Sequence, residues 1–223
     1  MPRDLTRNLA SIRARIVAAA TRAGRDPIGI SLVGVSKTHP GETIAEAWGA
    51  GLADFGENRV QVAIPKIDAL RERGITPRWH MIGHLQRNKV AAVVERFDII
   101  HTVDSLRLAT AINECAGRRI DVLIEVNIGG EPSKYGVSPD EAAPLADALA
   151  ALPHLELTGL MAVAPQADHS EDVRPVFRRL RELNESLGLR ELSMGMTDDF
   201  EVAIEEGSTL VRVGRAIFGE RAV

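Results

Sequence analysis

The sequence is poor in cysteine, in aromatic residues and in basic charge. One cysteine, Cys115, among 223 residues excludes an intramolecular disulfide and fits a reducing compartment. Aromatic residues make up 4% of the chain and the net charge is −4, so we do not expect a nucleic-acid binder that acts by neutralising phosphates. No apolar run approaches the roughly 18 residues of a membrane span, and no secretory signal is visible. We therefore expect a cytoplasmic protein that binds neither nucleic acid nor membrane.

Segments typical of strands and helices alternate along the chain. Apolar residues at helical intervals predict a first helix over 4–23. Eight apolar segments then predict strands over 30–36, 53–55, 78–82, 98–103, 121–128, 155–163, 191–194 and 209–213. The segments between these strands predict helices over 42–50, 58–73, 85–96, 105–116, 139–152, 171–187 and 198–206.

This alternation predicts an α/β fold with a parallel sheet. Eight strand–helix units are the number that closes a (β/α)8 TIM barrel, here with an additional N-terminal helix. The alternative is an open doubly wound sheet, but the glycine-rich G-x-G-x-x-G turn typical of that fold is absent. We expect a single domain over 1–223, with no residues left for a second one.

Lys37 follows the first predicted strand, and active sites of barrels lie at this end of the strands. Its side chain has the same parity as those of Val33 and Val35, which directs it into the barrel mouth. Removal from water favours the neutral amine, the form that attacks a carbonyl carbon to form a Schiff base. The alternative, more common for a lone lysine, is that Lys37 ends the strand in solvent.

The loops after the seventh and eighth predicted strands are rich in small and polar residues. Ser193, Gly195 and Thr197 offer hydroxyl and amide donors, and Arg212 offers a permanent positive charge. Barrels commonly bind phosphate at these two loops, so we interpret them as a phosphate site. The alternative is a threonine or aspartate helix cap beside a glycine turn.

Polar residues also follow the second and third predicted strands. Asn58 could cap the helix that begins there. His80 and His84 are four residues apart, but Gly83 lies between them at the end of a strand, and no Glu or Cys nearby completes a zinc set. We expect these groups to line the barrel mouth and assign no metal.

An amine on the first strand and a phosphate site on the last two suggest one cofactor. Pyridoxal 5′-phosphate (PLP) carries an aldehyde at one end and a phosphate at the other. The residues alone leave a second hypothesis open, a Schiff-base aldolase that acts on a phosphorylated sugar.

Several motifs, in this order and spacing, resemble the pyridoxal-phosphate homeostasis protein family. The similarity runs from near residue 5 to the C-terminus and rests on Gly34-Val35-Ser36-Lys37, Phe55-Gly56-Glu57-Asn58, Trp79-His80-Met81-Ile82-Gly83-His84-Leu85-Gln86, Gly159-Leu160-Met161, Ser193-Met194-Gly195-Met196, and Val211-Arg212-Val213-Gly214 with Ile217-Phe218-Gly219. The resemblance implies a PLP fold type III barrel, similar to the N-terminal domain of alanine racemase.

The same resemblance implies roles for individual residues. Lys37 would hold PLP covalently and Asn58 would approach the cofactor ring. Arg212 would contact either the phosphate or the pyridine nitrogen. The phosphate contacts would come from Ser193, Gly195, Met196 and Thr197, with Gly214 completing the loop. Arg215 stands where family members often carry a small hydroxyl residue, so a hydroxyl contact to phosphate is not expected there.

Members of this family have no established reaction and are thought to buffer PLP, a form of vitamin B6, and to deliver it. The resemblance therefore implies a PLP carrier, with apo PLP-dependent enzymes as partners, and we expect a monomer. The alternative is an amino-acid racemase-like PLP enzyme with weak activity. Racemisation needs bases on both faces of the substrate, and alanine racemases take one, a tyrosine, from a second domain. Tyr135, the only tyrosine here, follows the fifth predicted strand and leaves a weak side activity open.

Overall fold

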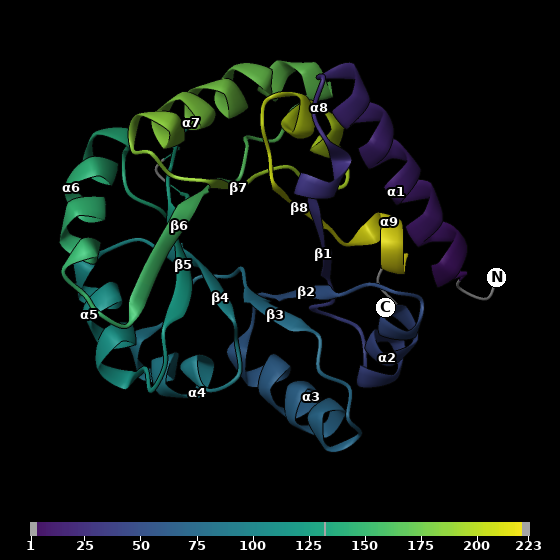
Figure 1. Ribbon diagram of the computed structural model, residues 1–223, viewed down its shortest axis with the longest axis horizontal. Helices are drawn as coiled ribbons and strands as arrows, with labels where there is room; N and C mark the ends of the chain where they lie inside the picture. The colour runs from purple at the N-terminus through teal and green to yellow at the C-terminus, as the bar shows by residue number, and fades with distance from the viewer. Residues whose placement is uncertain (1–3, 132, 220–223) are drawn as a thin grey trace.

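Eight parallel strands close into a barrel in the computed structural model, which describes residues 4–131 and 133–219. Each strand pairs with its neighbours in sequence, and β1 pairs with β8 to close the ring (Figure 1). The predicted (β/α)8 barrel is therefore confirmed. The strands are β1 Ser31–Val35, β2 Asp54–Glu57, β3 Arg78–Met81, β4 Ile99–Val103, β5 Ile120–Glu125, β6 Leu155–Met161, β7 Glu191–Ser193 and β8 Leu210–Val213.

Helices surround the barrel as an outer ring (Figure 1). The α-helices among the described residues are α1 Leu5–Arg22, α2 Gly41–Gly49, α3 Val60–Glu72, α4 Val90–Val94, α5 Leu106–Cys115, α6 Pro139–Ala150, α7 Arg174–Ser186, α8 Phe200–Glu205 and α9 Arg215–Phe218. Three short 3₁₀ helices accompany them: η1 Pro27–Gly29, η2 Arg87–Lys89 and η3 Ser170–Val173. None of the helices in the described part of the chain is long and apolar enough to cross a membrane.

The additional N-terminal helix packs against α8 and α9. The carboxylate of Asp4 caps α1 by accepting a hydrogen bond from the Arg7 N–H at 2.9 Å. The buried residues of α1, which include Leu9 and Ile12, recur at the predicted helical spacing. The face that they form lies against α8 and α9, so α1 covers the seam where the last units meet the first (Figure 1).

The barrel interior is separate from the larger core between strands and helices. It contains a small apolar cluster of five buried residues, Val33, Ile99, Leu123, Met161 and Leu210. Side chains alternate between the two faces of a strand, so the residues two positions further on also point inward. Several of these, among them His101 and Arg212, are polar and fully or almost fully buried. The upper half of the barrel is therefore a polar interior beneath the mouth.

Two boundaries differ from the predictions in ways that affect the site. The predicted strand over 121–128 ends at Glu125, because Val126 leaves the sheet and bridges Val137 across the loop. The helix predicted over 85–96 is divided into η2 and the short α4. Both differences place irregular backbone at the mouth of the barrel, where loops can accommodate a ligand.

Candidate functional site

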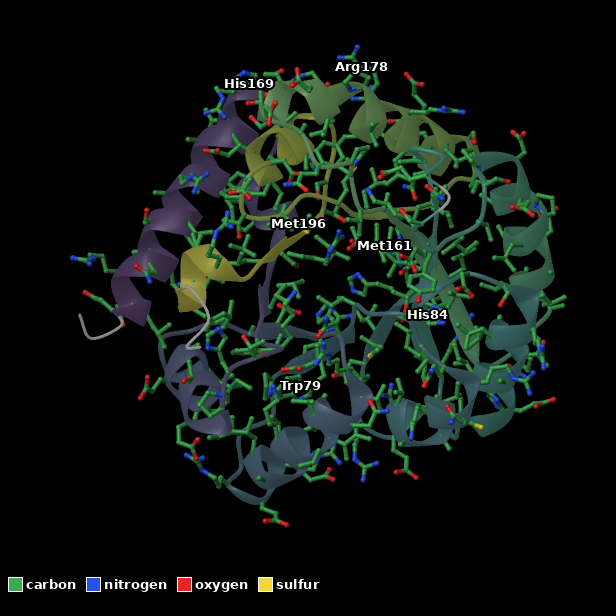
Figure 2. All side chains as sticks on the ribbon, turned by 180° about the vertical axis from the view of Figure 1, so that it is seen from behind. Trp79, His84, Met161, His169, Arg178 and Met196 are labelled. Carbon is green, nitrogen blue, oxygen red and sulfur yellow. The ribbon has the colours of Figure 1, made fainter. Side chains whose placement is uncertain are left out.

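A cavity of about 580 Å³ opens at the carboxyl ends of β1, β7 and β8. It brings together five of the eight sequence-predicted cofactor residues: Lys37, Met196, Thr197, Arg212 and Gly214. Met196 lies close to the middle of the ring of strands, whereas His169 and Arg178 lie at the outer edge of the molecule (Figure 2). The volume is within the range of small-molecule sites.

Lys37 lies on a turn that a buried ion pair holds in place. Lys66 Nζ donates a hydrogen bond to Glu57 Oε1 at 2.6 Å, and it also reaches the carbonyl oxygens of Ser36 and His39 at 3.3 Å. The Ser36 hydroxyl donates to the same Glu57 oxygen at 2.7 Å. Glu57 is fully buried and Lys66 is 13% exposed, so this pair is shielded from solvent. Sequence reasoning missed the role of both residues.

The loop after β7 depends on a glycine that no other residue could replace without strain. Gly195 has φ +92°, and a Cβ there would lie 2.5 Å from Ala203 Cβ. The close approach lets the loop fold back onto α8, and it leaves Met196 and Thr197 beside the cavity. Gly195 thus shapes the loop but is not among the described residues that line the cavity.

Arg212 forms the floor of the cavity. Its guanidinium donates to Ser193 Oγ at 2.6 Å through Nη1 and to the carbonyl oxygen of Ala162 at 2.9 Å through Nη2. Burial lowers the pKa of Arg212 to about 10, although the charges of Asp199 and Glu125 oppose that change. A guanidinium with this pKa remains positively charged at neutral pH.

Two predicted site residues have surroundings that the sequence did not indicate. Asn58 does not cap α3: the helix begins at Val60, and Asn58 Oδ1 is buried without a hydrogen-bond partner. Ser193 is fully buried, and its hydroxyl contacts His101 and Arg212. Neither is among the described residues that line the cavity.

His80 does not line the mouth, contrary to expectation. It is fully buried inside the barrel, where its ring nitrogens contact His101 and Asp54, both at 2.9 Å. His84 does lie at the mouth, in the loop after β3, 3.4 Å from Asp104 and stacked on Tyr135 at a centroid distance of 4.0 Å. The reason is strand parity: His80 belongs to β3 and points inward, whereas His84 follows the strand.

Glu125 ends β5 on the same side of the mouth, and sequence reasoning missed it. Burial raises the pKa of its carboxyl to about 7, and the charge of Asp104 adds to this effect. Its Oε2 atom is buried without a partner. An acidic residue between apolar neighbours in the segment predicted as a strand over 121–128 was the available signal.

The residues present fit PLP. Lys37 brings an amine to the cavity that Thr197 and Gly214 also line, and Arg212 supplies a buried positive charge. The unpartnered Asn58 Oδ1 is an acceptor that a ligand could satisfy. Among residues 4–131 and 133–219, no group of three His, Cys, Asp or Glu side chains is placed to hold a metal ion.

Comparison with known proteins agrees with this geometry. The family described as alanine racemase, N-terminal domain, matches residues 7–222. The chain is 45% identical over 222 residues to the pyridoxal phosphate homeostasis protein of Aquifex aeolicus, covering 96% of both chains. It is 46% identical over 228 residues to that of Escherichia coli K12, covering 98% of this chain and 97% of the relative. The chain belongs to the pyridoxal phosphate homeostasis protein family.

Solved structures show the same barrel. PipY of Synechococcus elongatus, solved with PLP bound, superposes with a TM-score of 0.85 at 34% identity, covering 97% of this chain and 100% of PipY. An alanine racemase of Clostridium difficile superposes with a TM-score of 0.76 at 18% identity, and this chain covers 57% of it. The second likeness shows the fold alone, and it confirms the predicted PLP fold type III barrel.

Proposed function

We propose that the protein binds PLP in the cavity at the ends of β1, β7 and β8, and that it takes part in PLP homeostasis. The observation that carries the proposal is that Lys37, Thr197 and Gly214 line one cavity whose floor is Arg212. The PLP bound to PipY and the names of the curated relatives support it.

Lys37 is the amine that we assign to the Schiff base. The sequence has four lysines, Lys37, Lys66, Lys89 and Lys134. Lys66 is paired with Glu57, and Lys134 contacts Glu131 and two carbonyl oxygens. Lys37 is the lysine that lines the cavity. When bound, PLP would supply an electrophilic aldehyde carbon, and Lys37 Nζ is the amine that would hold the cofactor covalently.

The remaining residues divide between the two ends of the cofactor. We assign the phosphate to the loops that carry Thr197 and Gly214, with Met196 beside it, because these loops lie at the rim of the cavity. We assign Arg212 to the pyridine end, because Ser193 and Ala162 hold its guanidinium inside the barrel. In this arrangement Ser193 acts by holding Arg212, and Gly195 acts by shaping the backbone of the loop after β7. Asn58 Oδ1 would accept a hydrogen bond near the ring.

A cavity that holds PLP reversibly would let the protein buffer the cofactor and deliver it to apo-enzymes. A lysine Schiff base hydrolyses back to the free aldehyde, so the stored cofactor remains available. We therefore assign a carrier role and no reaction on a substrate.

The test begins with the purified protein after incubation with PLP. We expect a visible absorption band that borohydride reduction removes, and a phosphopyridoxyl group on Lys37 in the mass spectrum of the reduced protein. Lys37→Ala should lose this adduct, whereas Lys89→Ala, a matched lysine on η2, should keep it. A colourless protein without an adduct would contradict the proposal.

A second experiment separates a carrier from an enzyme. The loaded protein is mixed with an apo PLP-dependent enzyme, with and without a scavenger of free PLP. Transfer that persists in the presence of the scavenger supports delivery. Sustained turnover of alanine or another amino acid at ordinary enzymatic rates would instead favour the racemase-like alternative.

A further inference from the structure

A hydrogen-bonded chain of five polar residues crosses the interior of the barrel. Arg212 Nη1 is 2.6 Å from Ser193 Oγ, and Ser193 Oγ is 2.8 Å from His101 Nδ1. His101 Nε2 is 2.9 Å from His80 Nδ1, and His80 Nε2 is 2.9 Å from Asp54 Oδ1. The chain therefore passes through β8, β7, β4, β3 and β2 in turn.

The two ends of this chain lie in different environments. Arg212 lines the proposed cofactor cavity. Asp54, at the start of β2, lines a separate groove of about 380 Å³ and has a side chain 17% exposed. The three residues between them, His80, His101 and Ser193, are completely buried. These three side chains must hydrogen-bond to their neighbours in the chain, since burying a polar group without a hydrogen-bond partner costs free energy.

The chemistry of the two ends fixes the direction of the two outer hydrogen bonds. A guanidinium can only donate, so Ser193 Oγ accepts from Arg212. A carboxylate can only accept, so His80 Nε2–H donates to Asp54. With His80 neutral, its Nδ1 must accept from His101 Nε2–H. His101 Nδ1 then accepts the hydroxyl proton of Ser193. All four bonds form with one proton on each imidazole.

The opposite direction would require an extra proton. If His101 carried its proton on Nδ1, its Nε2 would need a donor, and His80 would have to be protonated on both nitrogens. Burial is the largest cause that lowers the pKa of His101 well below its ordinary value, which agrees with a neutral ring at that position. Asp54 is the acidic group in contact with His80, and Ser193 is the neutral group in contact with His101.

We propose that His80 and His101 are positioning residues: as two neutral imidazoles protonated on Nε2, they hold Ser193 as the acceptor for Arg212 and so fix the guanidinium at the floor of the cavity. The consequence for PLP rests on the proposed function, whereas the arrangement of protons does not. Arg212 then presents its unused N–H donors to the cavity in a single orientation. No contact between either histidine and the cofactor is involved.

The first test is made on the wild-type protein without PLP. Two-bond ¹⁵N–¹H correlation spectra distinguish the protonated from the unprotonated nitrogen of each histidine. We expect both His80 and His101 to carry the proton on Nε2 at pH 7.5. A proton on Nδ1 of His101, or on both nitrogens of His80, would overturn the proposal.

The second test measures PLP affinity and the visible absorption of the bound cofactor. Ser193→Ala and His101→Leu should each weaken binding about tenfold, since the first removes the acceptor of Arg212 and the second removes the group that orients that acceptor. The double variant should bind no more weakly than either single variant, because all act through the same guanidinium. Ser193→Thr, which retains the hydroxyl, should restore most of the affinity. Additive losses would contradict the proposal.

Ser208→Ala is the matched control. Ser208 is also completely buried, but its hydroxyl contacts only carbonyl oxygens, those of Leu192, Met194 and Leu210. We expect this variant to lose stability without altering the pH profile of the visible band, whereas Ser193→Ala should shift that profile. Identical pH profiles for the two variants would contradict the proposal, because Ser193 would then contribute to packing alone. If the wild-type protein takes up no PLP, the proposed function fails, while the histidine spectra still decide the arrangement of protons.

Discussion

Arg215 Nη2 donates hydrogen bonds to both carboxylate oxygens of Asp198, at 2.6 and 2.7 Å. Asp198 belongs to the loop after β7, and Arg215 begins α9 after β8. The pair thus joins the two loops that flank the cavity, which both residues line. Arg215 therefore ties the loop after β7 to the loop after β8.

Removing the Arg215–Asp198 pair should weaken PLP binding more than it lowers the stability of the fold. The side chains of Arg215 and Asp198 are 57% and 78% exposed, so Arg215→Ala should lower the free energy of unfolding by less than about 1 kcal/mol. The Kd for PLP should rise roughly twofold to fivefold. Arg22→Ala is the control, because the Arg22 side chain is 53% exposed and pairs with Glu205 at 2.7 Å. Neither residue of this pair lines the cavity. Equal Kd values for the two variants would contradict this prediction.

The ion pair of Lys66 and Glu57 should be needed for stability and for the reactivity of Lys37. Lys66→Ala leaves the fully buried Glu57 carboxylate without its partner, which should cost about 3 kcal/mol in urea unfolding. The borohydride-trapped adduct on Lys37 should also form more slowly, because the turn loses its anchor. The double variant Glu57→Gln/Lys66→Met should recover most of the stability. Adduct formation at the wild-type rate in Lys66→Ala would show that the turn needs no anchor.

Glu125 should make the protein less stable as the pH rises from about 4.5 to about 7. The pKa of this carboxyl is about 7 in the folded protein and near 4.5 when unfolded, so the folded state binds one more proton in this interval. The free-energy cost of ionising the buried Glu125 carboxyl is absent below about pH 4.5. It reaches its full size, about 3 kcal/mol, above about pH 7. Glu125→Gln should remove it, so its gain over wild type in urea unfolding should be larger at pH 8 than at pH 5. A constant difference at both pH values would refute this assignment.

Gly195→Ala should disturb the loop after β7 by two separable effects. The residue has φ +92°, which alone costs about 1 kcal/mol for alanine, and the new Cβ would meet Ala203 Cβ at 2.5 Å. Gly188→Ala isolates the first effect, because Gly188 has φ +65° and nothing within 4 Å of a built Cβ. We expect a larger loss of unfolding free energy for Gly195→Ala, together with weaker PLP binding. Equal losses would mean that the loop relaxes around the new methyl group.

Local patterns were sufficient for the fold. The alternation of strand and helix segments predicted eight units, and the structure has eight strands in one closed ring. The sequence also predicted that Lys37 follows the first strand, and in the structure it lies on the turn after β1, beside the cavity. Strand parity, applied to β3, would have placed His80 inside the barrel.

The surroundings of the site residues could not be predicted in this way. Asn58 is a good capping residue by type, yet α3 begins at Val60 and leaves its side chain oxygen unpartnered. Whether a side chain caps a helix depends on the backbone angles at that residue, and here Gly83 packs against the backbone of Asn58. Residue type therefore indicated a polar group at the mouth but not its partner.

The sequence by itself determined the barrel and its N-terminal helix, because periodicity and strand ends are local properties of the chain. Only the tertiary structure decided which polar groups meet. His101 and Ser193 are 92 residues apart and come into contact because closure of the ring brings inward-facing positions of different strands together. The direction of the buried hydrogen bonds from Arg212 to Asp54 is a consequence of that closure, since each partner lies on a different strand.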